Sequence, residues 1–185
     1  YRPVVFADRV RFRRRAASAR APEADGAVAP AELLDTGPLL LALLPAPVRV
    51  YDSRSGKAPD GTDADTGATD VKWVRGTRLR IDVAYVLGDT TRPTGVPPDA
   101  QGVALNVTAT SIKYGGRLMV WSGALADSEP PATSSVNWSA TSGQVNSLVL
   151  SRCGEGRVHV ELNGASGCEA EVIIDVVGYL AAALV

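Results

Sequence analysis

The stretch Gly102–Thr110, "GVALNVTAT", decides the fold class, because its larger apolar residues alternate with smaller or polar ones. A period of two is typical of a β-strand that turns one face toward a core. We therefore expect Val103, Leu105 and Val107 to face the core. Asn106 also begins an Asn-Val-Thr acceptor pattern for N-glycosylation. Since it falls within a strand and not on an exposed loop, we do not interpret it as a glycan site.

The same alternation recurs from residue 48 to the end of the chain. It is clear in "RLRIDVAYV" (78–86) and in "RVHVEL" (157–162), whose valines are predicted inside, with His159 and Glu161 outside. The nearly continuous apolar run "AEVIIDVVGYL" (170–180) predicts a central strand covered on both faces. Clusters of Gly, Pro, Asp and Ser separate these segments, and no long helical pattern follows residue 48. The pattern predicts an all-β protein, an antiparallel, jelly-roll-like β-sandwich.

The pair Asn163-Gly164 predicts a hairpin between the last two strands, since this dipeptide favours a tight two-residue turn. Cys153 and Cys168 lie on either side of it. A cysteine pair in a turn-rich β domain favours a disulfide. A regular register, however, would hold the two Cα atoms farther apart than the roughly 7 Å that a disulfide allows. Both alternatives, a disulfide and two free thiols, stay open at this point.

The first 47 residues differ in character from the remainder, and we assign two regions: an extended arm and linker (1–47) and the sandwich domain (48–185). Residues 1–20 contain seven arginines and one acid, which leaves 12 basic and 19 acidic residues in 21–185, a net charge of −7. A basic segment ahead of an acidic domain indicates an interaction arm. The run "LLLALLP" (39–45) is too short to cross a bilayer, so we predict no membrane span.

We expect this arm to dock onto other protein subunits, because exposed apolar stretches favour association. Phosphate binding by "RVRFRRR" (9–15) is the alternative. The acidic remainder and the lack of a base-reading motif make nucleic acid the less favoured partner. The candidate docking residues are Arg9, Arg11, Phe12, Arg13, Arg14, Arg15, Leu39, Leu40 and Leu41.

Two tryptophans are candidates for glycan binding. Trp121 and Trp138 each end a predicted strand, and an exposed ring in that position would stack on a sugar. A place in the core or at its rim is the structural alternative for both side chains.

The acidic loop "DGTDADTGATD" (60–70) is the one candidate for a metal. Carboxylate oxygens on a flexible loop suit calcium, and the ligands would be Asp60, Asp63 and Asp65. The loop lacks the closing glutamate of an EF-hand, so we prefer a solvated loop and predict no cofactor. Asp175 lies inside an apolar strand and is expected to pair with an arginine.

No nucleophile signature accompanies the single histidine, His159, and no G-x-S-x-G motif is present. Without a nucleophile beside a base and an orienting acid, a hydrolase triad has no support. We therefore predict that the protein is not an enzyme.

Five stretches carry a resemblance to a known family. They are "RVYDSR" (49–54), "GVPPDAQGVALNVTAT" (95–110), "GRLMVW" (116–121), "SSVNWSATSGQVNSLVL" (134–150) and "EVIIDVVGYL" (171–180). In order and spacing they resemble a β-rich module of secreted and surface-associated proteins of actinobacteria, also carried by viruses of these bacteria. The resemblance implies a non-catalytic accessory or display role, and it brings no defined ligand. The first 47 residues fall outside it.

Together these observations predict a non-enzymatic structural module, displayed on the surface of a larger oligomeric assembly and anchored by its arm. A head-decoration or tail component of a phage virion fits this description. The alternative is a secreted carbohydrate- or cell-wall-binding module of an actinobacterium, whose partner is a cell-surface glycan. The expected location is accordingly a virion surface, or the cell surface and extracellular space.

Overall fold

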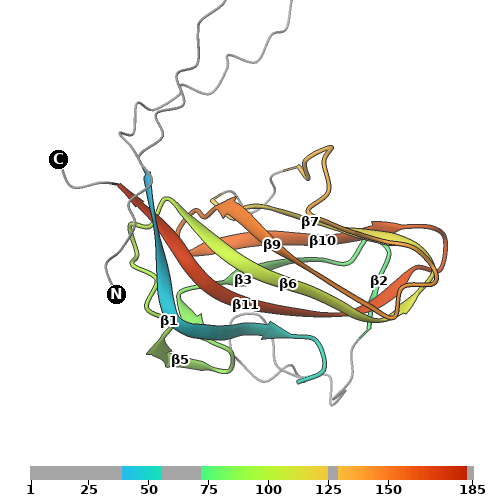
Figure 1. Ribbon diagram of the computed structural model, residues 1–185, viewed down its shortest axis with the longest axis horizontal. Coiled ribbons are helices and arrows are strands. Elements are labelled where there is room, and N and C mark those ends of the chain that lie inside the picture. The colour runs from blue at the N-terminus through green and yellow to red at the C-terminus, as the bar shows by residue number, and fades with distance from the viewer. Residues whose placement is uncertain (1–38, 56–71, 125–128, 183–185) are drawn as a thin grey trace, which may run out of the picture. The chain divides into compact units, whose positions relative to one another are not determined.

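The structure, a computed structural model, describes residues 39–55, 72–124 and 129–182 (Figure 1). The regular elements in these ranges are β-strands, and their pairings are antiparallel. They form a five-stranded sheet, a four-stranded sheet and a small two-stranded hairpin. The all-β prediction is therefore confirmed.

Each sheet draws its strands from distant parts of the chain. The five-stranded sheet comprises β1 (Leu39–Asp52), β2 (Trp73–Val74), β6 (Gly102–Lys113), β9 (Gln144–Arg152) and β11 (Glu169–Ala182). The four-stranded sheet comprises β3 (Arg78–Asp82), β7 (Gly116–Ser122), β8 (Val136–Trp138) and β10 (Arg157–Gly164). The hairpin comprises β4 (Tyr85–Val86) and β5 (Asp89–Pro93).

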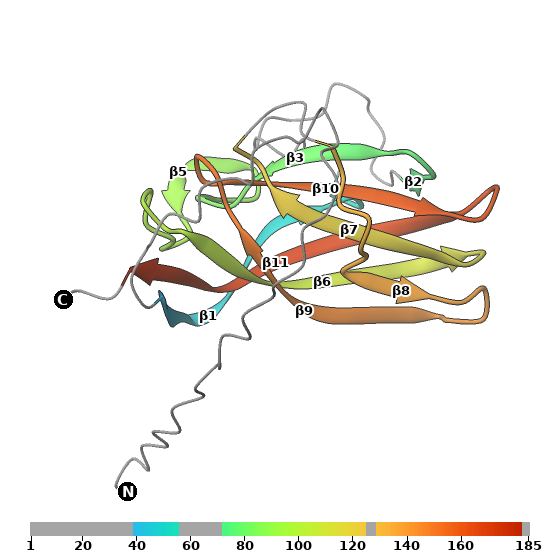
Figure 2. The ribbon, with the colours of Figure 1, turned by 90° about the horizontal axis from the view of Figure 1, so that it is seen from above.

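The order of the strands is that of a jelly roll. The five-stranded sheet runs β1-β11-β6-β9, with β2 beside one end of β11, and the four-stranded sheet runs β3-β10-β7-β8. The first long strand thus pairs with the last, and the chain passes back and forth between two packed layers (Figure 2). Apart from the short β2, each layer thus has four strands in sequence, and two such layers connected in this way define the double-sheet jelly roll. The predicted jelly-roll-like β-sandwich is confirmed.

The core lies between the two layers, where the alternating residues of both sheets meet. Val103, Leu105 and Val107 of β6 are fully buried in it, as the stretch "GVALNVTAT" predicts. The four-stranded sheet contributes the alternating apolar residues of β10 from the other side. Burial of such aliphatic side chains is the main stabilising contribution of the fold, at roughly 25 cal/mol for each Å² of apolar surface removed from water.

The predicted hairpin at Asn163-Gly164 is wrong, because β10 and β11 belong to different sheets. Gly164 is the last residue of β10 and pairs with Gly116 of β7. A Cβ atom on Gly164 would lie 2.6 Å from the carbonyl oxygen of Gly115. The glycine is therefore required by the close approach of two backbones, and the chain crosses to the other layer in the residues that follow.

Strand β1 crosses the predicted boundary between arm and domain, at residues 47 and 48. It extends over Leu39–Asp52 and pairs with β11 on both sides of Pro45 and Pro47. The register shifts between Leu43 and Val48, so the prolines lie in an irregular stretch of an edge strand. Proline is tolerated at such a place, since the N–H group that it lacks has no neighbouring strand to reach.

Candidate functional site

The first half of β1 is the most exposed apolar segment among the described residues. We call Leu39–Leu44 the leucine edge; it contains the predicted docking residues Leu39, Leu40 and Leu41. The side chains of these three residues and of Leu43 are between 38% and 72% exposed. The other predicted docking residues, Arg9, Arg11, Phe12, Arg13, Arg14 and Arg15, lie outside the described residues.

The exposed leucines continue onto the outer face of the five-stranded sheet. In one row across the sheet, Leu43 pairs with Gly178, Gly178 with Ala104, and Ala104 with Leu150. Leu150 is 57% exposed and Leu148, on the same strand, is 64% exposed. The small central residues thus lie between leucines on the two edge strands, β1 and β9.

Sequence reasoning missed this second group of leucines. The signal was present in "NSLVLS" (146–151), where Leu148 and Leu150 alternate with the buried Val149. Apolar residues on both faces of a strand indicate that its outer face has an apolar environment or a partner.

The second half of β1 is held by ion pairs instead. Arg49 lies opposite Asp175 of β11, and its Nε donates a hydrogen bond to the Asp175 carboxylate at 2.7 Å. Its Nη1 is 2.8 Å from the Asp52 carboxylate, which also accepts from Arg54 at 2.8 Å. The predicted arginine partner of Asp175 is therefore Arg49.

These contacts shift the protonation equilibria of the groups involved. The hydrogen bond from Arg54 is the main reason why the pKa of Asp52 lies below its ordinary value. The hydrogen bond to Asp175 likewise raises the pKa of Arg49. Both groups are thus held in their charged forms, and the network ties the strand to its neighbour.

The two tryptophans predicted to bind glycans, Trp121 and Trp138, do not present free aromatic faces to solvent. Trp138 is buried beside Gly116, and its Nε1 donates a hydrogen bond to the Tyr114 carbonyl at 3.1 Å. Trp121 is half-buried, and its ring stacks on His159 with 5.1 Å between the ring centroids. Trp138 therefore offers no exposed ring for stacking on a sugar, and the ring of Trp121 already stacks on a neighbouring side chain.

The outward residues of β10 are also buried, contrary to the prediction that His159 and Glu161 face solvent. His159 is only 2% exposed. The reason is that long side chains from the flanking strands cover β10. Arg78 of β3 forms an ion pair with Glu161 at 2.7 Å and places its guanidinium 5.5 Å from the Trp121 ring centroid.

The two cysteines are free thiols, which decides between the two alternatives. Cys153 Sγ donates to the Ala100 carbonyl, whereas Cys168 lies beside Gly164. Gly154 pairs with Arg157, so the two cysteines lie near opposite ends of the eight-residue strand β10, which extends for roughly 23 Å at about 3.3 Å per residue. A disulfide requires Cα atoms within about 7 Å. Burial raises the pKa of both thiols.

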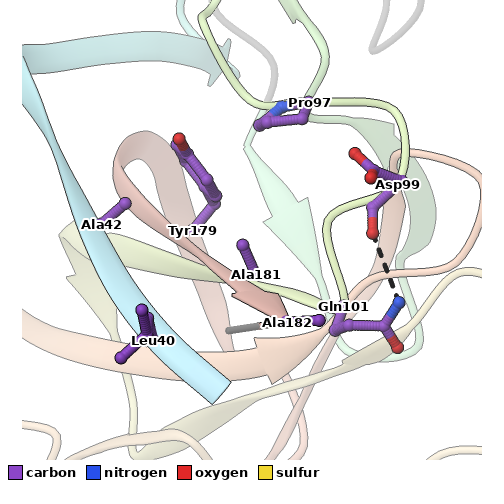
Figure 3. A pocket seen from close by; sticks show the side chains of 8 residues that line it. All are labelled: Leu40, Ala42, Pro97, Asp99, Gln101, Tyr179, Ala181 and Ala182. Atoms are coloured by element: carbon purple, nitrogen blue, oxygen red, sulfur yellow. Dashed lines mark hydrogen bonds between the residues drawn. The ribbon is translucent and has the colours of Figure 1, made fainter. Parts of the chain in front are cut away.

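A cavity of about 610 Å³ opens beside the leucine edge (Figure 3). Leu40 and Ala42 of β1 form one wall, Tyr179 of β11 lies next to them, and Asp99 and Gln101 close the opposite side. The Gln101 side-chain amide donates to the backbone carbonyl of Asp99 at 3.3 Å, which ties the loop ahead of β6 together. Apolar walls with a few polar groups are typical of small-molecule pockets of this size. The sequence contains no motif that marks it.

Two other expectations concern metals and membranes. The calcium candidates Asp60, Asp63 and Asp65 lie outside the described residues, and within the described ranges no three His, Cys, Asp or Glu side chains gather in a way that would hold a metal ion. In the part of the chain that the structure describes, there is no helix of the length and hydropathy that would span a membrane.

Comparison with known protein families, with curated protein sequences and with solved structures found no significant match.

Proposed function

We propose that the protein is a non-enzymatic structural module, displayed on the surface of a larger assembly and bound to other protein subunits through its N-terminal region. A phage virion, with this protein as a head-decoration or tail component, is the assembly that we favour. We further propose that residues 48–180 are related to the modules of actinobacterial proteins and their viruses that they resemble in sequence.

The exposed leucine edge carries this proposal. Jelly rolls occur in viral capsid proteins and in lectins alike, so the fold alone does not choose a function. A run of exposed leucines on an edge strand does favour a protein partner, because large apolar surfaces on soluble proteins mark interaction sites. The leucines also lie within residues 1–47, the region whose sequence suggests a docking arm.

Density-gradient centrifugation of the producing culture tests the proposal. We expect the chain to co-sediment with particles, and we expect the double variant Leu41→Lys/Leu43→Lys to move to the soluble fraction, because charged side chains oppose burial in an apolar interface. Leu148→Lys/Leu150→Lys, which changes leucines of similar exposure on β9, is the matched control. Wild-type protein that stays wholly in the soluble fraction would contradict the proposal.

The cavity beside β1 favours a second candidate, a secreted carbohydrate- or cell-wall-binding module. Tyr179 offers an aromatic ring, and Asp99 and Gln101 offer the polar groups that orient a sugar. A glycan array tests it: specific hits that are lost in Asp99→Ala and kept in Tyr114→Ala would support this candidate. Tyr114 is an exposed tyrosine at the far end of β6. An array with no hits would remove it.

A further inference from the structure

Edge strands of sheets usually carry features that prevent pairing with another chain, such as prolines, bulges and charges. The second half of β1 has all three, in Pro45, Pro47, the register shift before Val48, and Arg49. In addition, the Leu87 N–H donates to the Arg49 carbonyl at 2.9 Å, so this part of the edge is partly occupied.

The leucine edge has none of these features. Leu39–Leu44 contains no proline, no charge and no bulge, and its pairing with β11 is regular from Leu39 to Leu43. Within the described residues, no backbone hydrogen bond reaches these residues from the side away from β11. A regularly paired, apolar edge that the described residues leave uncovered is a template for another strand.

We propose that the leucine edge pairs in antiparallel fashion with the leucine edge of a second copy, across a two-fold axis. The pairing joins the five-stranded sheets of two molecules into one continuous sheet. This inference rests on the proposed function, in which β1 is the docking strand, and it names the first partner of that strand.

The composition of the edge is what selects a second copy as the partner. The sequence Leu40–Leu44, "LLALL", reads the same in both directions, so an antiparallel pairing centred on Ala42 places Leu41 opposite Leu43 of the other copy and only leucine or alanine opposite leucine or alanine. Pro45 limits the pairing at each end because it has no N–H to donate. Two-fold symmetry also continues the antiparallel order of the sheet.

The side chains around the edge support the same partner. On the outer face, Leu41 and Leu43 of one copy would lie next to the same residues of the other, which removes both sets from water. On the inner face, Leu40 and Ala42 form a wall of the cavity, and the added strand would extend that apolar wall (Figure 3). The other edge strand of this sheet, β9, lies beside β8 of the second sheet (Figure 2).

Sedimentation velocity of the full chain over a range of concentrations tests the pairing. Since the contact is small, we expect a reversible dimer with micromolar affinity. Leu41→Lys/Leu43→Lys should weaken it by about tenfold or more, whereas Leu148→Lys/Leu150→Lys should leave it unchanged. A monomer at every concentration overturns the inference. So does an equal loss in both double variants, which would indicate packing through the face of the sheet.

Hydrogen exchange locates the contact. We expect the amides of Leu39–Leu44 that point away from β11 to lose protection on dilution, in step with dissociation, while the amides that bond to β11 and those of β9 keep theirs. Protection of the outward-pointing amides that is independent of concentration would mean that the chain covers its own edge, which overturns the inference. The proposed function fails separately: a monomer that still needs Leu41 and Leu43 to co-sediment with particles refutes self-pairing alone.

Discussion

The two halves of strand β1 pair with the same neighbour, β11, yet they differ in almost every other respect. Val50 and Tyr51 in the second half are buried in the core, and Arg49 and Asp52 beside them form ion pairs. The leucine edge in the first half is exposed and uncharged. One strand thus combines a half that stabilises the fold with a half that the described residues leave largely exposed, and it is the exposed half that we propose for docking.

The largest effect on the free energy of unfolding is expected in the core, where Tyr51 in the second half of β1 contacts Trp73 of β2. Trp73 is 1% exposed, and its Nε1 donates to the Tyr51 hydroxyl at 2.7 Å. Trp73→Ala should lower the free energy of unfolding by about 3–5 kcal/mol, since it leaves a large cavity. Chemical denaturation followed by circular dichroism measures the change. Trp73→Phe keeps most of the packing and should cost less; an equal loss in both would show that the hydrogen bond dominates.

A smaller effect on the free energy of unfolding is expected from the ion pairs of Arg49, Asp52 and Arg54. Asp52→Asn should lower the free energy of unfolding by about 1–2 kcal/mol at neutral pH, because Arg49 and Arg54 lose a charged acceptor. The folded pKa of Asp52 lies below the ordinary 3.8. Its contribution is therefore complete above the unfolded pKa and is lost as pH falls through the folded pKa.

The pH dependence provides the measurement for this variant. The difference in unfolding free energy between wild type and Asp52→Asn should shrink as the pH is lowered below about 4. Denaturation curves collected at several pH values, at constant ionic strength, would show it. A difference that stays constant across this range would mean that the charge of Asp52 contributes nothing.

The smallest effect is expected at the leucine edge itself. Leu43→Lys should change the free energy of unfolding by no more than about 0.5 kcal/mol, because Leu43 is 72% exposed. The same substitution at Leu44, which packs against the core, should cost about 1–3 kcal/mol. Thermal or chemical denaturation of dilute protein compares the two. Equal losses would show that the exposed side chains of the leucine edge stabilise the fold as much as Leu44, which packs against the core, and the leucine edge would then contribute to stability like the second half of the strand.

Much of the fold was predictable because it depends on local alternation. Val103, Leu105 and Val107 face the core, as do the valines of β10, and the arginine expected beside Asp175 is Arg49. Strand β1 was harder to predict, since Pro45 and Pro47 argue against a strand. Pairing with β11 on both sides of the prolines overrides that local signal.

The candidate site was only partly predictable. The leucines of the edge were evident as an apolar run that needs a partner, whereas Leu148, Leu150 and the cavity beside Tyr179 were not. The burial of His159 and of Trp138 was not predictable for one reason. Alternation tells which side of a strand a residue occupies, but it does not tell whether side chains from neighbouring strands cover that side.

By itself, the sequence determined that this protein is an antiparallel β-sandwich and that it carries an apolar run of leucines, because the period of two and the run of leucines are local properties of the chain. Only the tertiary structure decided that the chain crosses between sheets after Asn163-Gly164, that the cysteines are apart, and that Leu39–Leu44 belongs to an edge strand of the sandwich. Each of these depends on which strands become neighbours. That choice is made by contacts between residues far apart in the sequence, which a local pattern does not contain.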